Sequence, residues 1–292
     1  MLTINPKDIP MQKMHGYLQG AVIPRPIAFA STIDTTGNVN LSPFSFFNVF
    51  SSNPPILVFS PSRRGRDSTT KHTYENVKTI PEVVINIVSY SIVEQASLTS
   101  CEFPTGVNEF KKAGLTEVKS EFIRPPRVGE SPVSMECKVN QIIDLGSGGG
   151  AGSLVVCEVL LMHIKEEVLD EQGRIDPFKL DAVARMGSDY YVRVNGDSIF
   201  TVPKPNQNIG IGFDQIPDTI KNSPILTGND LGRLANVERL PESEVIATFV
   251  ETPELTDAIK QGEMAVHSLA QHYLKIGKID DAWKVLLANQ KK

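Results

Sequence analysis

Cysteine is scarce in this sequence, and its spacing excludes two classes of small, cross-linked fold. The three cysteines, Cys101, Cys137 and Cys157, are far apart, and no CxxC pair occurs. A disulfide framework or a structural zinc site needs closely set cysteine pairs, so neither is expected. We predict reduced thiols in the core of the fold.

A large excess of positive or negative charge is also lacking. The 29 Lys and Arg against 34 Asp and Glu leave a formal net charge of -5. Without a basic field, the chain offers little attraction to a phosphate backbone, and we expect no nucleic-acid partner. The five histidines show no HxxxH spacing, so no metal site is expected.

Long apolar runs are missing as well. The stretch 35–62 contains no charged residue, but four prolines and many Ser and Asn residues interrupt it. These would leave backbone groups without hydrogen bonds in lipid, so this stretch is not a transmembrane helix. The amino-terminal residues lack the apolar core of a signal peptide. We therefore expect a cytoplasmic protein with no membrane association.

Short runs rich in β-branched and aromatic residues predict strands between Ile23 and His163. They are separated by turn formers and read IAFAST, ILVF, VVINIVSY, CKVNQIID and SLVVCEVLLMHI. The pattern predicts a mainly β domain with some α, an antiparallel barrel. The run Gly146–Ser153 does not fit GxGxxG and lies between two strands, so it predicts a flexible hairpin tip. Connecting helices are predicted over Asp67–Lys78, Ile92–Cys101 and Glu109–Ala113.

The pattern changes towards the C-terminus, which gives three expected parts. Residues 1–195 form the barrel, and the Pro- and Gly-rich segment 196–251 is expected to wrap over it or to reach a second subunit. Residues 252–292 predict a helical hairpin. In this hairpin, Thr252 caps a first helix that runs to Gly277, and a second helix spans Asp280–Ala288.

The segment Ser42–Phe59 alternates small hydroxyl residues with phenylalanines and leads through a loop into Pro54-Pro55. A strand edge with backbone N–H groups beside flat apolar faces suits a planar heteroaromatic ligand. The alternative is that the phenylalanines form barrel core. The following segment, Ser60–Thr73, crowds hydroxyl and cationic groups at the start of a predicted helix. This suits a phosphate group, and the alternative is a solvated basic turn.

Several stretches, in order, resemble the flavin reductase-like family of FMN-binding split barrels, which includes flavoredoxin. They are VIPRPIAFAST (22–32), the Ser42–Phe59 segment, KHTYEN (71–76), VINIV (84–88), EFKKAGLT (109–116), RPPRVGESPVSMECKV (124–139) and RMGSDYY (185–191). The resemblance covers roughly residues 15 to 195. It implies a six-stranded antiparallel split β-barrel with connecting helices and a C-terminal helical extension, usually as a homodimer with FMN at the subunit interface.

The resemblance also implies which residues bind the cofactor. The ring would be lined by Ser42, Pro43, Phe44, Ser45, Phe46 and Phe47, and the phosphate would be held by Ser60, Ser62, Lys71 and Thr73. The family often has KDT at this last point, and here His72 replaces the Asp. Arg25 would point at FMN or a nicotinamide, or else form a structural ion pair.

Three further residues are candidates, each with a structural alternative. Asn86 interrupts an apolar strand, so its buried amide either ties neighbouring strands or meets the ribityl chain of FMN. Arg185 and Tyr190 are expected to close the site, or else to take part in ordinary interface packing. No catalytic acid or base is predicted, because the flavin itself supplies the redox chemistry.

Three functions remain open on the sequence. The first is an NAD(P)H-dependent FMN oxidoreductase that reduces free flavin or another acceptor. The second is a flavoredoxin-like electron carrier without nicotinamide turnover, which receives electrons from a redox partner protein. The third is a flavin-binding module without redox function. For the extension after residue 195, covering the cleft, extending the dimer interface and recruiting a partner are all open.

Overall fold

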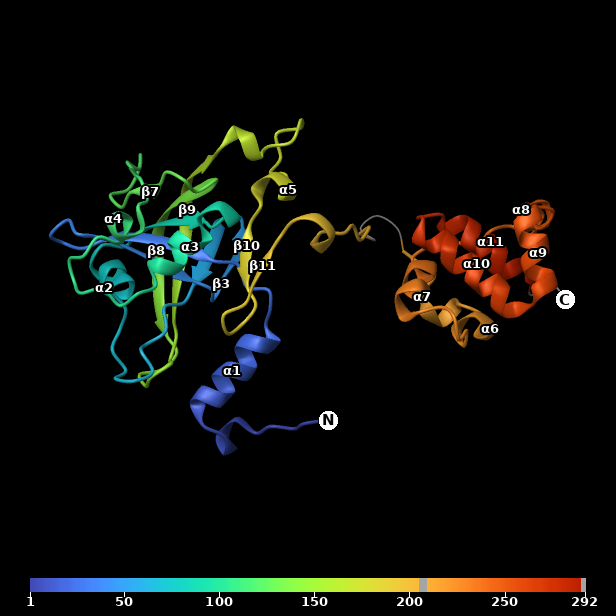
Figure 1. The fold of residues 1–292 in the computed structure, drawn as a ribbon, viewed down its shortest axis with the longest axis horizontal. Coiled ribbons are helices and arrows are strands. Elements are labelled where there is room, and N and C mark those ends of the chain that lie inside the picture. Colours follow the sequence, from blue (N-terminus) through green and yellow to red (C-terminus); the bar gives the residue numbers. More distant parts are fainter. Residues whose placement is uncertain (205–208, 290–292) are drawn as a thin grey trace. The chain divides into compact units, whose positions relative to one another are not determined.

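The chain folds into two compact units, Met1–Phe200 and Thr201–Lys292 (Figure 1). This computed structural model describes residues 1–204 and 209–289. Residues 205–208 of the predicted segment 196–251, and residues 290–292 of the predicted hairpin, lie outside the described residues. The first unit contains the strands and the second contains only helices, so the described chain is a mixture of α and β rather than mainly β.

The first unit is built on one antiparallel sheet of seven strands in the spatial order β2-β1-β5-β8-β9-β4-β3. The prediction of six strands is therefore corrected to seven. The strands are β1 (Ala28–Ile33), β2 (Val39–Phe44), β3 (Phe47–Ser52), β4 (Pro55–Phe59), β5 (Glu82–Ile87), β8 (Val133–Asp144) and β9 (Ser153–Ile164).

Strand β3 lies where a polar loop was predicted. It pairs with β4, placing Phe47 opposite Phe59 and Asn48 opposite Val58, and its other edge is unpaired in the sheet. Polar side chains are tolerated on an edge strand because one side of it faces water. Pro43, which has no N–H to donate, is likewise placed on an edge strand, β2.

The sheet is curled by a short connection. Strands β2 and β3 are its two edges, yet only Ser45 and Phe46 separate them in the chain. The edges must therefore come close together, as in an incompletely closed barrel. The interior is filled by apolar side chains from six of the seven strands: Ala28, Ala30, Phe44, Leu57, Phe59, Val83, Ile85, Met135, Cys137, Val139, Val155 and Cys157. Two of the three cysteines are thus core residues, as predicted, and Cys101 is exposed.

A second core lies on the other face of the curled sheet. Phe29 of β1 and Leu41 of β2, both fully buried, contribute to it together with Phe110. The helices of this unit are α1 (Met11–Ala21), α2 (His72–Thr79), α3 (Val93–Leu98), α4 (Glu109–Ala113) and α5 (Pro177–Leu180). Two short ribbons, β6 (Glu117–Val118) with β7 (Arg127–Val128) and β10 (Val183–Arg185) with β11 (Tyr191–Arg193), complete it.

The predicted helix starting at Asp67 begins five residues later, at His72. The Asp67 carboxylate instead accepts hydrogen bonds from the Thr69 backbone N–H at 3.0 Å and hydroxyl at 2.6 Å. Ser68 takes a left-handed conformation with φ of 60°. Local side chain to backbone bonds of this kind compete with helix formation. The prediction for α4 is confirmed at both ends, and α3 is shorter than predicted.

The glycine run joins β8 to β9, which confirms the predicted hairpin. Its tip is tied down rather than free, since the Arg63 N–H donates to Ala151 O at 2.8 Å and the Gly150 N–H donates to Arg63 O at 3.1 Å. Gly149 is needed for this contact, because a Cβ there would lie 2.8 Å from Gly65 O.

The second unit is a helical bundle with its own apolar core. It contains α6 (Asp218–Lys221), α7 (Gly228–Ala235), α8 (Ser243–Val250), α9 (Pro253–Gln261), α10 (Glu263–Lys275) and α11 (Ile279–Ala288). The core includes Leu231 and Leu234 of α7 together with Leu255, Leu274 and Trp283. The expected boundary at residue 251 therefore falls inside one unit, and much of the predicted wrapping segment is helical.

The predicted helical hairpin is three helices instead of two. Gly262, with φ of 104°, separates α9 from α10. Thr252 does occupy the N-cap position of α9, but its hydroxyl donates back to Phe249 O at 2.9 Å and does not cap the helix. No helix within the described ranges is long and apolar enough to cross a membrane.

Replacing Leu274 by alanine is expected to destabilise the helical unit by about 2 to 5 kcal/mol, because a fully buried leucine leaves a cavity. The measurement is denaturant unfolding followed by fluorescence of the single tryptophan, Trp283, which lies in the same core. Ile276→Ala, at a position 52% exposed, is the control and should change the free energy of unfolding by less than about 0.5 kcal/mol. Equal effects of the two variants would contradict the assigned core.

Candidate functional site

The predicted ring platform lies at the corner between the two edge strands. Its six residues, Ser42, Pro43, Phe44, Ser45, Phe46 and Phe47, end β2, form the corner and begin β3. Neighbouring residues of a strand point to opposite faces. Phe44 is buried, with its ring 5.5 Å from that of Phe59, whereas Phe46 is 37% exposed. The barrel-core alternative thus applies to Phe44, while Phe46 is accessible.

Arg25 is buried next to this corner. Its Nε lies 3.5 Å from Ser45 Oγ, and its guanidinium is 6.0 Å from the centre of the Phe46 ring. Nη1 donates to Gln19 O at 2.5 Å and Val22 O at 2.7 Å, so the guanidinium caps the C-terminal end of α1. These contacts differ from the structural ion pair that was the alternative for Arg25. Nη2 is buried without a hydrogen-bond partner among the described residues, so it has donors to offer.

Arg185 lies beside Arg25, as the two backbones exchange hydrogen bonds of 3.0 and 2.9 Å. Burial and then the neighbouring Arg185 charge lower the pKa of Arg25. The Arg185 guanidinium donates to Ser188 O at 2.6 Å and stacks 4.6 Å from the Tyr191 ring. Tyr190 is 73% exposed. The structure thus brings Arg185 to the platform, and Tyr190 extends into solvent.

Asn86 is fully buried, and its amide connects three segments. Nδ2 donates to Phe29 O at 2.9 Å, while Oδ1 accepts from the Val128 N–H at 3.0 Å and from the Ser134 hydroxyl at 2.7 Å. A buried amide needs such partners. These contacts favour the strand-tying alternative over contact with a ligand.

Three of the predicted site residues, Ser42, Lys71 and Thr73, line one small cavity of about 30 Å³. Arg64 and His72 line it too. Lys71 is the N-cap residue of α2, so the first N–H groups of that helix also lie here. Thr73 is fully buried, and its hydroxyl accepts from Asn40 Nδ2 at 2.9 Å.

Ser60 and Ser62 do not line this cavity. The Ser60 N–H donates to Phe46 O at 2.8 Å, which ties β4 to the platform corner. Its hydroxyl lies close to Gly152, where a Cβ would come within 2.6 Å of Oγ. Ser60 therefore stands at the glycine-rich hairpin.

Positive charge gathers at the cavity. Arg64 Nε lies 3.0 Å and Lys71 Nζ 3.9 Å from Glu102, and Arg66 Nη2 lies 2.6 Å from the same carboxylate. Burial followed by the Arg64 charge lowers the pKa of Lys71. The pKa of His72 is lowered in the same order by burial, Arg64 and Lys71. Asp67 also pairs with Arg66, at 3.2 Å. An anion entering here would be attracted by the Arg64 and Lys71 charges.

Two carboxylates of this cavity were missed by the sequence prediction. Glu102 follows α3, and Glu109 begins α4; both line the cavity. Glu109 is 4% exposed and accepts the Leu41 N–H at 3.0 Å, and burial raises its pKa. The EFKKAGLT stretch included Glu109, but nothing in its residues indicated that the side chain turns toward β2.

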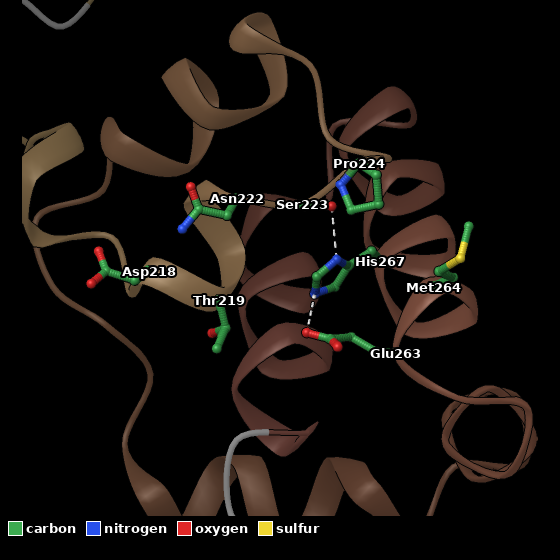
Figure 2. Close-up of a pocket in the computed structure, with 8 residues that line it drawn as sticks. All are labelled: Asp218, Thr219, Asn222, Ser223, Pro224, Glu263, Met264 and His267. Carbon is green, nitrogen blue, oxygen red and sulfur yellow. Dashed lines mark hydrogen bonds and ion pairs between the residues drawn. The ribbon is translucent and has the colours of Figure 1, made fainter.

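A second hollow, of about 390 Å³, lies in the helical unit. Figure 2 shows His267 between Ser223 and Glu263. His267 Nδ1 lies 2.7 Å from Ser223 Oγ, and Nε2 is 4.0 Å from Glu263 Oε1. The Ser223 oxygen also accepts the N–H groups of Ile225 and Leu226, both at 3.2 Å. This hydroxyl thus organises the turn between α6 and α7.

Comparisons with known proteins assign most of the sheet unit to a family. The model of the flavin reductase-like domain matches residues 20–179. The chain belongs to the flavin reductase-like family. The match covers the platform, Arg25 and the cationic cavity, and it ends before β10 and the helical unit. Within the described ranges, no group of three or more His, Cys, Asp or Glu is placed to hold a metal ion.

Three relatives illustrate the family. An uncharacterised protein from Aquifex aeolicus is 38% identical over 65% of this chain and 95% of its own length. The structure of nitrilotriacetate monooxygenase component B from Bacillus cereus is 30% identical, with a TM-score of 0.65 over 69% of this chain and 98% of that one. A structure from Shewanella frigidimarina, described as a flavin reductase with a split barrel domain, is 27% identical, with a TM-score of 0.57 over 68% and 95%.

We predict that Glu109→Gln stabilises the protein above about pH 4.5 and has little effect below it. Because its pKa is raised from 4.5 in the folded chain, the native state binds more protons than the unfolded state above that value. Stability is therefore lost as the pH rises through the folded pKa. A glutamine keeps an acceptor for the Leu41 N–H and has no charge to bury.

Denaturant unfolding of both proteins across pH 4 to 8 measures this difference. Glu171→Gln, at an exposed position, is the matched control and should follow the wild type. A Glu109→Gln curve parallel to that of the wild type at every pH would refute the burial argument.

Proposed function

We propose that this protein binds FMN and transfers electrons from NAD(P)H through it to free flavin or another acceptor. The observation that carries the proposal is the cationic cavity at the start of α2. One of its lining residues lies on β2, the strand that leads into the platform corner. Ser42 lines the cavity, and Ser45 lies three residues further along the chain, beside Arg25. One extended ligand with an anionic end and a flat end would reach both places.

The donors in these two places fit the cofactor. At the cavity, hydroxyl, ammonium, guanidinium and helix N-terminal N–H groups are the donors that phosphate prefers. At the corner, the buried Nη2 of Arg25 has no partner in the described chain. A polar atom left in this way costs free energy unless a ligand or partner satisfies it. An oxygen or nitrogen at the rim of the flavin ring would do so.

The protein has a limited part in the chemistry. FMN, when bound, supplies the hydride and electron transfer. Arg25 would hold a positive charge at the ring edge, and the Phe46 side chain would cover apolar surface of the ligand. Arg185 adds a second charge within the same neighbourhood, and we assign no acid or base to the described side chains. An anionic form of the ligand would be stabilised by these charges.

We further propose a homodimer with the site at its interface. Three large apolar side chains of the corner and β3 are exposed, Phe46 at 37%, Val49 at 61% and Phe50 at 68%. Apolar side chains gathered on an unpaired edge strand favour burial against a second surface. Tyr190, also exposed, would then reach the flavin of the same or the other subunit.

A flavoredoxin-like carrier is the second candidate. It would use the same cofactor site but receive its electrons from a redox partner protein. The helical unit lies outside the family match and offers a separate surface for such a partner. We propose the oxidoreductase first because Arg185 adds a second cationic side chain beside Arg25, and this second charge suits a phosphorylated cosubstrate.

The colour of the purified protein tests the cofactor, and its bleaching tests the donor. We expect absorbance bands at about 375 and 450 nm, typical of oxidised flavin, either as purified or after adding FMN. Anaerobic NADH or NADPH should then bleach the band near 450 nm. Bleaching only with a reduced partner protein would select the carrier. A colourless protein that does not take up FMN would refute both.

Lys71→Ala is expected to weaken FMN binding by about 1.5 to 3 kcal/mol, the contribution of one charge-assisted hydrogen bond. Titration of the apoprotein with FMN, followed by flavin fluorescence, measures the dissociation constant. Riboflavin, which has no phosphate, should bind the variant and the wild type alike.

Lys78→Ala is the matched control, because Lys78 lies in the last turn of the same helix and outside the cavity. It removes the same charge and should leave FMN affinity unchanged. An equal loss for Lys71→Ala and Lys78→Ala would show a general charge effect and would remove Lys71 from the site.

A further inference from the structure

Glu102 places a carboxylate among the cations of the proposed phosphate cavity. Its oxygens lie 3.0 Å from Arg64 Nε, 2.6 Å from Arg66 Nη2 and 3.9 Å from Lys71 Nζ. Arg66 has one further acidic neighbour, Asp67, at 3.2 Å. Glu102 is therefore the shared acceptor of three cationic side chains from one segment. A phosphate group bound here would need the same donors.

The two anions would compete for the same donors. The Arg64 Nε–H that donates to Glu102 at 3.0 Å would have to turn from the carboxylate to a phosphate oxygen. Glu102 is one of the groups that line the cavity, and its side chain is 39% exposed. Moving this side chain outward would enlarge the cavity and would return the carboxylate to water.

The segment that carries Glu102 is an irregular connection between two helices. It connects the end of α3 at Leu98 to the start of α4 at Glu109 and forms no strand pairing. Besides the Glu102 ion pairs, Thr105 Oγ1 lies 3.3 Å from His72 Nε2. Side-chain contacts of Glu102 and Thr105 thus join the segment to the region around the first turn of α2.

We propose that Glu102 is an internal competitor for the phosphate of FMN, which binds the cations when the cofactor is absent and leaves when the phosphate enters. This inference rests on the proposed function, and it assigns to Glu102 the control of cofactor affinity. Cofactor exchange follows from the competition. The carboxylate takes over the cations as FMN departs, so the flavin behaves as an exchangeable ligand rather than as a permanently held group.

The charges of the phosphate and of Glu102 decide which of the two holds the cations. Phosphate monoesters carry close to two negative charges at neutral pH and a carboxylate carries one, so the ligand can displace Glu102 from Arg64 and Lys71. Before the phosphate can bind, the ion pairs of Glu102 with Arg64 and Lys71 must break. Exposed ion pairs contribute little each, so removing the competitor is expected to tighten FMN binding by only about 3- to 10-fold.

Glu102→Gln is the variant that tests the competition, because it keeps the shape of the side chain and removes its charge. The dissociation constants of FMN and riboflavin are measured by titrating the apoproteins, with the FMN release rate measured by stopped flow. We expect a 3- to 10-fold lower constant for FMN, slower release and an unchanged constant for riboflavin. Glu94→Gln, an exposed position on α3, is the matched control and should bind FMN as the wild type does.

The outcomes separate the competition from the proposed function. Normal FMN binding by the wild type with equal or weaker binding by Glu102→Gln overturns the competition alone, since Glu102 would then be neutral or would support the site. An equal gain for riboflavin also overturns it, because the effect would not involve the phosphate. If neither protein binds FMN while both remain folded by thermal melting, the proposed function fails and this inference fails with it.

Discussion

The two-residue connection between β2 and β3 is the constraint on which the candidate site depends. These strands are the opposite edges of a seven-stranded sheet, and Ser45 and Phe46 alone link them. So short a connection keeps the edges together and curls the sheet. It also places the corner against Arg25, so the interior core and the platform result from one geometric requirement. The backbone pairing of Arg25 with Arg185 then adds β10 to the same place.

The cationic cavity depends on where α2 begins. Because Asp67 bonds to Thr69 and the chain stays irregular to Lys71, the basic residues before the helix fold back over its first turn. Arg64 donates to the Thr69 hydroxyl at 3.0 Å and to Thr70 O, and it is positioned toward Glu102. A helix starting at Asp67 would have placed Lys71 inside the helix. The later start makes Lys71 the N-cap residue, next to the first N–H groups of α2.

The helical unit is held together by its own apolar core. Its core is independent of the barrel core, and it combines α6 and α7 with the helices after residue 252. Trp283 illustrates the packing, since its Nε1–H donates to Leu234 O at 3.0 Å across 49 residues of sequence. Apolar spacing indicated the later helices. The earlier ones were hidden because α6 has only four residues and α7 contains two glycines.

Local patterns in the sequence predict the strand runs, the family resemblance, α4 and the grouping of Lys71 with Thr73, because alternation, turn residues and short motifs act over neighbouring residues. They do not determine that Asn86 ties three segments or that Glu102 and Glu109 enter the cavity. These features depend on groups tens of residues apart that only the folded chain brings within bonding distance, and no local pattern records them.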